Sequence, residues 1–79
     1  MPRFYFHLVN DVDAPDEEGT ELPDLSAARE HAVRNARFTM AETLKEQGTL
    51  VKRHRIQIED DAGNVLDTVY FGDVVLVED

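Results

Sequence analysis

Positions 25–46 contain neither glycine nor proline, and this uninterrupted stretch limits the possible folds more than any other feature of the chain. It is rich in Ala, Glu, Arg and Leu, which favour helix. Asp24 precedes it as an N-cap, and Gly48 follows it where a positive φ ends a helix. At about 100° per residue, one apolar stripe forms. The stripe consists of Leu25, Ala28, Ala32, Ala36, Met40 and Leu44. The sequence therefore predicts one long helix whose alanines allow close contact with a sheet.

Two segments alternate as half-buried strands do. Residues 3–9 place Phe4 and Phe6 on one face, and residues 54–60 place Ile56 and Ile58 inward. A further short strand is predicted at residues 20–22, returning alongside the first.

A hairpin is predicted between the last two strands. Residues 60–64 read DDAGN, which fits a type I turn followed by Gly63 in the left-handed region. In residues 65–71 neither face is cleanly apolar, which indicates a bulge or an edge position. We nevertheless expect this strand between the other two, because that order makes every neighbouring pair antiparallel.

The expected fold is α+β, with element order β-(β)-α-β-β. One long helix packs on a three- or four-stranded, mainly antiparallel sheet as a two-layer sandwich. Residues 1–79 form a single domain, because a chain of 79 residues has room for only one. Residues 72–79 form an apolar C-terminal tail, which we expect to pack on the domain or on a second copy.

Composition excludes several classes of function. Hydrophobic residues make up 42% of the chain and charged residues 32%, as in a globular rather than a disordered protein. The net charge of -9 opposes binding to nucleic acid. There is no cysteine for a disulfide, a thiolate zinc site or a nucleophile, and no apolar run long enough for a signal peptide or a membrane span. We expect a cytoplasmic protein that requires no cofactor.

Three segments together resemble a known family. They are PRFYFHL at the start, DEEGTELPDLSAAR with the alanine-rich helix after it, and DDAGNVLDTVYF near the end. This combination is similar to small bacterial proteins of the domain of unknown function 6894. The resemblance implies a bacterial source and a stand-alone domain, and it brings no established activity and no catalytic residues.

An acidic segment without Lys or Arg follows the first strand, and a mimic or inhibitor would present such carboxylates to a basic partner. Read as a calcium loop that begins at Asp11, the segment has Asp16 in place of the glycine and Leu22 in place of the bidentate glutamate. We therefore expect no specific metal. The candidate acidic surface consists of Asp11, Asp13, Asp16, Glu17 and Glu18, and the same run continues to Asp24.

Histidines and basic residues give weaker hypotheses. The histidines at positions 7, 31 and 54 lack metal-ligand spacing, and the helical wheel places His31 on the outer side of the helix. The cluster at residues 52–55, KRHR, does not overcome the net charge, so we expect no nucleic-acid partner. An enzyme would need a pocket that holds at least two of Tyr5, His7, His54 and Glu59. We rank the enzyme hypothesis last.

The candidate protein interface is apolar. Phe38 lies on the helix side opposite the apolar stripe, where an exposed aromatic ring can contribute to a docking patch. The tail carries four consecutive apolar residues, Val74, Val75, Leu76 and Val77. We therefore favour a non-enzymatic interaction module that self-associates as a homodimer or binds another protein. The acidic inhibitor or mimic is the alternative.

Overall fold

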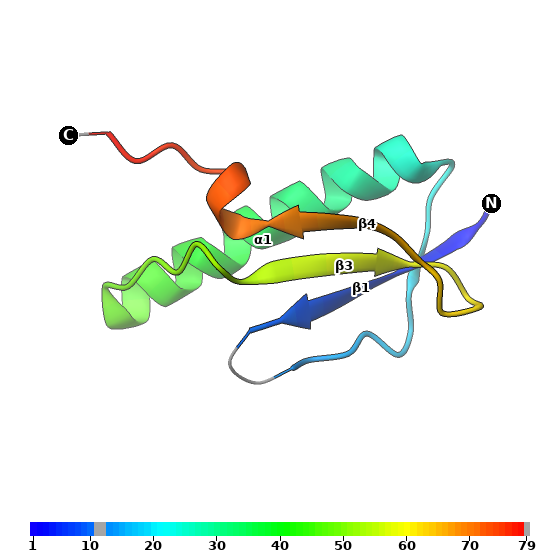
Figure 1. The fold of residues 1–79 in the computed structure, drawn as a ribbon, viewed down its shortest axis with the longest axis horizontal. Helices are drawn as coiled ribbons and strands as arrows, with labels where there is room; N and C mark the ends of the chain where they lie inside the picture. The colour runs from blue at the N-terminus through cyan, green and yellow to red at the C-terminus, as the bar shows by residue number, and fades with distance from the viewer. Residues whose placement is uncertain (11–12, 79) are drawn as a thin grey trace.

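The structure is a computed structural model that describes residues 1–10 and 13–78. It has two layers, with one helix packed on one face of a four-stranded antiparallel sheet (Figure 1). The strand order is β2-β1-β3-β4. The elements are β1 (Arg3–Val9), β2 (Thr20–Glu21), α1 (Leu25–Gln47), β3 (Arg55–Glu59), β4 (Val65–Tyr70) and the short 3-10 helix η1 (Phe71–Asp73). The predicted α+β fold and element order are confirmed.

The ends of α1 follow the sequence signals closely. The side chain of Asp24 accepts a hydrogen bond from the Ala27 amide at 2.9 Å. Gly48 has a φ of 67° and donates its N–H to the Leu44 carbonyl, which closes the last turn. Each end of the helix thereby gains a partner for one backbone group that has none inside the helix.

The apolar stripe of α1 is buried in its middle and exposed at both ends. Ala28, Ala32, Ala36 and Met40 are buried. Leu25 and Leu44 are exposed, so the prediction that they belong to the core was wrong. A helix of 23 residues is about 34 Å long, whereas strands of five to seven residues span about 17–23 Å. The first and last turns of α1 therefore extend past the sheet.

The position of β4 differs from the prediction, because β3 and not β4 lies in the middle of the sheet. β3 is antiparallel to both neighbours, with Phe6 opposite Ile58 and Val69 opposite Ile56. Ile56 and Ile58 are both buried, as the middle of a sheet under a helix requires. β4 places the charged Asp67 opposite Ile58, and an edge strand tolerates such a residue better than an inner strand does.

A bulge resolves the uncertain phase of β4. Glu59 pairs with Val65 and Ile58 pairs with Asp67, so Leu66 is the extra residue. The bulge separates the inward face of Asp67 and Val69 from Val65, which is exposed. The predicted turn is confirmed, with Gly63 at a φ of 84° and its N–H bonded to the Asp60 carbonyl. Both readings of this strand, bulged and at an edge, are correct.

The core lies between α1 and the sheet. Five aromatic and aliphatic side chains of the sheet meet the alanines of α1, which let the helix backbone approach the strands. The buried residues are Phe4, Phe6, Ala28, Ala32, Ala36, Met40, Ile56, Ile58, Val69 and Phe71. The opposite face of the sheet has no helix over it (Figure 1).

Candidate interaction surface

The acidic segment closes the β1 edge of the sheet. Ala14 and Leu8 exchange backbone hydrogen bonds at 2.9 and 3.1 Å, and Thr20 pairs with Phe4. Between these two points, a carboxylate oxygen of Asp16 accepts the Phe6 amide at 3.2 Å. The backbone groups of Phe4, Phe6 and Leu8 that face this edge are therefore already hydrogen-bonded within the chain. At an open sheet edge, such groups would be available to a strand of another chain.

Asp16 holds the acidic segment against β1. Its second carboxylate oxygen accepts the amides of Glu18 at 3.2 Å and Gly19 at 3.1 Å. Its own amide donates to Nδ1 of His7 at 2.9 Å. The acidic surface predicted from the sequence includes Asp16, and both of its carboxylate oxygens already accept backbone amides of the same chain. Asp13, Glu17 and Glu18 are exposed, and Asp11 lies outside the described residues.

These contacts make stability depend on pH. Burial alone would raise the pKa of the Asp16 carboxyl. The amides of Gly19, Phe6 and Glu18, together with the nearby His7, outweigh that effect and lower the pKa. A carboxyl whose pKa is lower in the folded than in the unfolded chain stabilises the fold above its unfolded pKa. That stability is lost as the pH falls through the folded pKa.

We expect Asp16→Asn to lower the free energy of unfolding at pH 7 by about 1–2 kcal/mol, because hydrogen bonds to a charged acceptor are lost. The deficit relative to the unsubstituted chain should shrink as the pH falls below the ordinary aspartate value of 3.8. Urea unfolding at pH 7 and pH 3 measures both. Glu17→Gln removes the same charge from an exposed side chain and serves as the control. A deficit that stays constant with pH would contradict this role of Asp16.

The open face of the sheet brings together part of the proposed enzymatic set. Nε2 of His7 lies 3.4 Å from a carboxylate oxygen of Glu59, and Tyr5 is directly opposite Glu59 in the β1–β3 register. A hollow of about 420 Å³ lies beside them, between β1, β3 and the acidic segment. His54 is not part of this group, because its ring packs edge-on against Phe71 at 5.8 Å. Both ring nitrogens of His7 already have partners in the chain, which leaves this histidine poorly placed as a general base.

His31 differs from its predicted position. Its ring centroid lies 4.6 Å from that of Phe6, so it packs on the flank of α1 that faces β1. The helical wheel alone misplaced it, because the aromatic partner belongs to another element.

The apolar tail divides into two parts. Val74 and Val75 pack against the core of their own domain, and the Val74 carbonyl accepts a hydrogen bond from Nε of Arg37 at 2.9 Å. Leu76 is 81% exposed and Val77 is 58% exposed. Beyond η1 the tail runs away from the body of the molecule (Figure 1). The first half of the tail therefore packs on its own domain, and the second half offers apolar surface.

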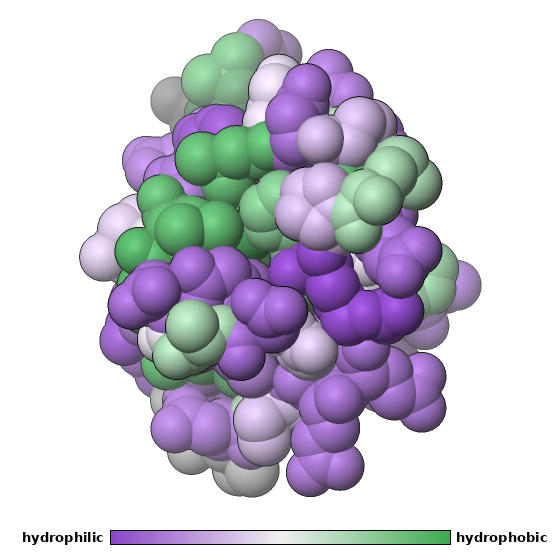
Figure 2. Space-filling model, turned by 90° about the vertical axis from the view of Figure 1, so that its right-hand side faces the viewer, coloured by the Kyte–Doolittle hydropathy of each residue, from purple (hydrophilic) through white to green (hydrophobic). Residues whose placement is uncertain are grey.

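β4 carries further exposed apolar side chains near its two ends. Leu66 is 40% exposed and Tyr70 is 46% exposed. Figure 2 views the end of the molecule at which α1 and β4 begin, and apolar residues gather there on one side while polar residues cover the rest. Val65 and Leu25 are the other exposed apolar residues of these two element starts. We call Leu66, Tyr70, Leu76 and Val77 the edge surface.

Phe38 is 68% exposed, as the wheel predicts. It follows Arg37, which faces the tail, by about 100° around α1. Phe38 therefore lies apart from the edge surface, on the outer side of the helix.

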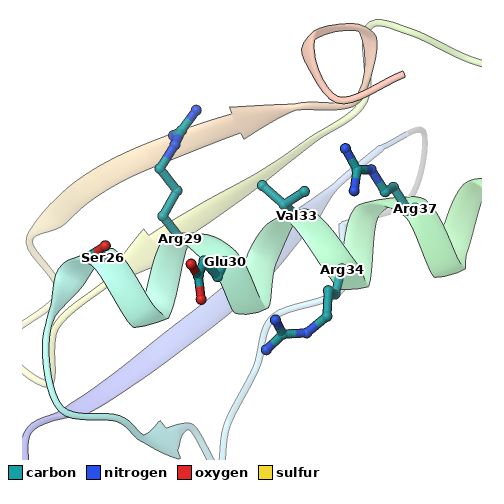
Figure 3. Close-up of a pocket in the computed structure, with 6 residues that line it drawn as sticks. All are labelled: Ser26, Arg29, Glu30, Val33, Arg34 and Arg37. Atoms are coloured by element: carbon teal, nitrogen blue, oxygen red, sulfur yellow. The ribbon is translucent and has the colours of Figure 1, made fainter. Parts of the chain in front are cut away.

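Sequence reasoning missed a groove on the flank of α1 that faces β4. The groove has a volume of about 310 Å³ (Figure 3). Nη1 of Arg29 reaches a carboxylate oxygen of Asp67 at 2.8 Å. Because Arg37 is held by Val74, the arginines at both ends of the groove are fixed. In the sequence, the signal for this groove was that its lining residues recur about one helical turn apart. We call the lining the arginine groove: Ser26, Arg29, Glu30, Val33, Arg34 and Arg37.

The part of the chain that the structure describes provides neither a membrane-spanning helix nor a metal-binding cluster. Residues 1–10 and 13–78 contain no helix with the length and apolar character needed to cross a membrane. Within the same ranges, no group of three or more His, Asp or Glu side chains is arranged to hold a metal ion.

A known family model matches most of the chain. The family model described as domain of unknown function (DUF6894) matches residues 3–72. Neither the curated proteins nor the solved structures include a match. The matched span extends from the start of β1 into η1, so it contains the whole sheet and α1 and ends before the exposed half of the tail.

Proposed function

The chain belongs to the DUF6894 family, a domain of unknown function, and we propose that it is a non-enzymatic protein-interaction module that self-associates through its edge surface. A domain of this size buries only about 60–65% of the surface of its unfolded chain, so a second copy adds useful apolar burial. The proposal includes a bacterial cytoplasmic location, with which a chain without cysteine is compatible.

The observation that carries the proposal is the difference between the two edges of the sheet. The β1 edge is covered by the acidic segment and by β2, which is only two residues long. β4 is the other outer strand and carries the exposed Leu66 and Tyr70, and the tail with the exposed Leu76 and Val77 follows from its end through η1. Exposed apolar side chains along an uncovered strand and the segment that follows it are typical of a contact with another protein.

The backbone of β4 supports a contact made mainly by side chains. The Phe71 amide donates to the His54 carbonyl, so the alternation of an antiparallel strand turns the Tyr70 and Thr68 amides toward the open edge. The Thr68 amide is already bonded to a carboxylate oxygen of Asp67 at 2.8 Å. An unbroken ladder with another strand would have to displace this carboxylate. Contact through the exposed side chains leaves it in place.

The test is the solution mass, measured by light scattering after size-exclusion chromatography at micromolar concentration. We expect the intact chain to have twice its monomer mass of 9.0 kDa. A chain that ends at Val75 keeps the packed half of the tail, and we expect it to be a folded monomer. We expect the full-length Leu66→Lys variant to be a folded monomer as well. Circular dichroism checks that both variants fold.

Phe38→Lys is the matched control, because it places the same charge on an exposed apolar position outside the edge surface. We expect it to remain a dimer. A monomeric intact chain would refute self-association and would favour the alternative, in which the exposed Asp13, Glu17 and Glu18 contact a basic partner. A monomeric Phe38→Lys beside an unaffected Leu66→Lys would move the contact to the outer side of α1.

A further inference from the structure

The arginine groove concentrates positive charge in an acidic protein. The chain has eight Lys and Arg residues against seventeen Asp and Glu, yet three arginines line this one groove. Arg29 and Arg37 each use part of their guanidinium on their own chain, through Asp67 and the Val74 carbonyl. A guanidinium carries five N–H donors, so both retain donors for a further acceptor.

Arg34 and Val33 supply the two kinds of contact that the groove can make. Among the described residues no hydrogen bond or ion pair that includes Arg34 is found, and its side chain extends from the side of α1 opposite to the side chains of Arg29 and Arg37 (Figure 3). Val33 is partly buried against the core and lies between Arg29 and Arg37 on the same flank (Figure 3). The groove therefore suits a segment that presents an apolar side chain followed by a carboxylate.

The C-terminal tail has this chemistry. Leu76, Val77 and Glu78 are exposed and follow one another directly. In an extended segment, Leu76 and Glu78 point to the same side about 6.6 Å apart. The tail leaves its own domain beside Arg37, at one end of the groove, and runs away from it (Figure 1). A second copy is the source of a tail that can approach the groove from outside.

Resting on the self-association proposed above, we infer that the arginine groove of one copy receives the C-terminal tail of a second copy. Leu76 packs on Val33, and the Glu78 carboxylate meets the Arg34 guanidinium. Because the two copies are identical, the exchange is reciprocal, and each dimer contains the contact twice.

A charge swap tests this contact. We expect Arg34→Glu and Glu78→Arg each to raise the dimer dissociation constant about tenfold or more, because each places like charges together at both contacts of the dimer. The double variant should return to within about threefold of the intact chain, since it restores opposite charges. Sedimentation equilibrium at low salt measures all four proteins. Lys45→Glu makes the same change in net charge as Arg34→Glu but lies outside the groove. We expect it to have little effect on the dimer dissociation constant.

A peptide provides a second measurement that does not need the dimer. A synthetic peptide of residues 72–79 should bind to the chain that ends at Val75, more weakly at high salt, and should lose binding when that chain carries Arg34→Glu. If that shortened chain is monomeric but Arg34→Glu leaves the dissociation constant of the full chain unchanged, the tail binds elsewhere and only this inference fails. A double variant no better than the single variants would also overturn it. A monomeric intact chain overturns both proposals.

Discussion

Phe71→Ala is expected to lower the free energy of unfolding by about 3–5 kcal/mol, the largest loss of any single substitution considered for this chain. Phe71 is only 2% exposed, and its ring packs against the core and edge-on against His54. It begins η1, so the backbone around it is held by the strand end and cannot easily collapse into the space that the ring leaves. The cost therefore includes both lost burial and an unfilled cavity.

The consequence for the fold is severe. At about 0.05–0.15 kcal/mol per residue, a chain of 79 residues has a total stability of about 4–12 kcal/mol. We expect Phe71→Ala to be partly unfolded at 25 °C, which urea titration followed by circular dichroism will show. Phe38→Ala is the matched control, because it removes the same ring from an exposed position and should change stability by less than about 0.5 kcal/mol. Equal losses at the two positions would mean that Phe71 is not a core residue.

Gly19→Ala should cost about 2–4 kcal/mol, from two causes that can be separated. Gly19 has a φ of 71°, which an L-residue adopts only with strain of about 1–2 kcal/mol. A Cβ at this position would also lie 2.8 Å from Cγ of Arg3, 2.9 Å from a Tyr5 ring carbon and 3.0 Å from the Phe4 carbonyl oxygen. The clash would push the acidic segment away from β1.

Gly63 supplies the control for the backbone effect alone. Its φ is 84°, but a Cβ there would meet nothing within 4 Å. We expect Gly63→Ala to cost only about 1–2 kcal/mol, and the difference between the two variants in urea unfolding gives the cost of the clash. If both substitutions cost the same, the close approach of Gly19 to β1 makes no contribution to stability.

Features that depend on neighbouring residues in the chain were predictable from the sequence. The Asp24 cap, the Gly48 terminus and the Gly63 turn were all predicted, and each is confirmed. The inward positions of Ile56 and Ile58 follow from simple alternation and are confirmed as well.

Features that depend on distant residues were not predictable in the same way. The order of β3 and β4 is decided by which strand α1 and β1 can best cover, and no local pattern contains that comparison. Asp16 looked like one more solvated carboxylate, because its amide partner on Phe6 is ten residues away. The arginine groove lies on one helix, but the residues that hold two of its arginines in place, Asp67 and Val74, are 38 and 37 residues away in the chain.

The closed β1 edge sets a limit on the size of any assembly. A sheet with two open edges can add copies at both sides and grow into a filament, as amyloid-forming proteins do. Here the acidic segment already occupies three edge positions of β1, and β2 beyond it is too short and too acidic to serve as a template. Copies that join through β4 therefore have no second edge from which to continue. In the proposed dimer, the carboxylate of Asp16 would close this side of each sheet and so stop the addition of further copies.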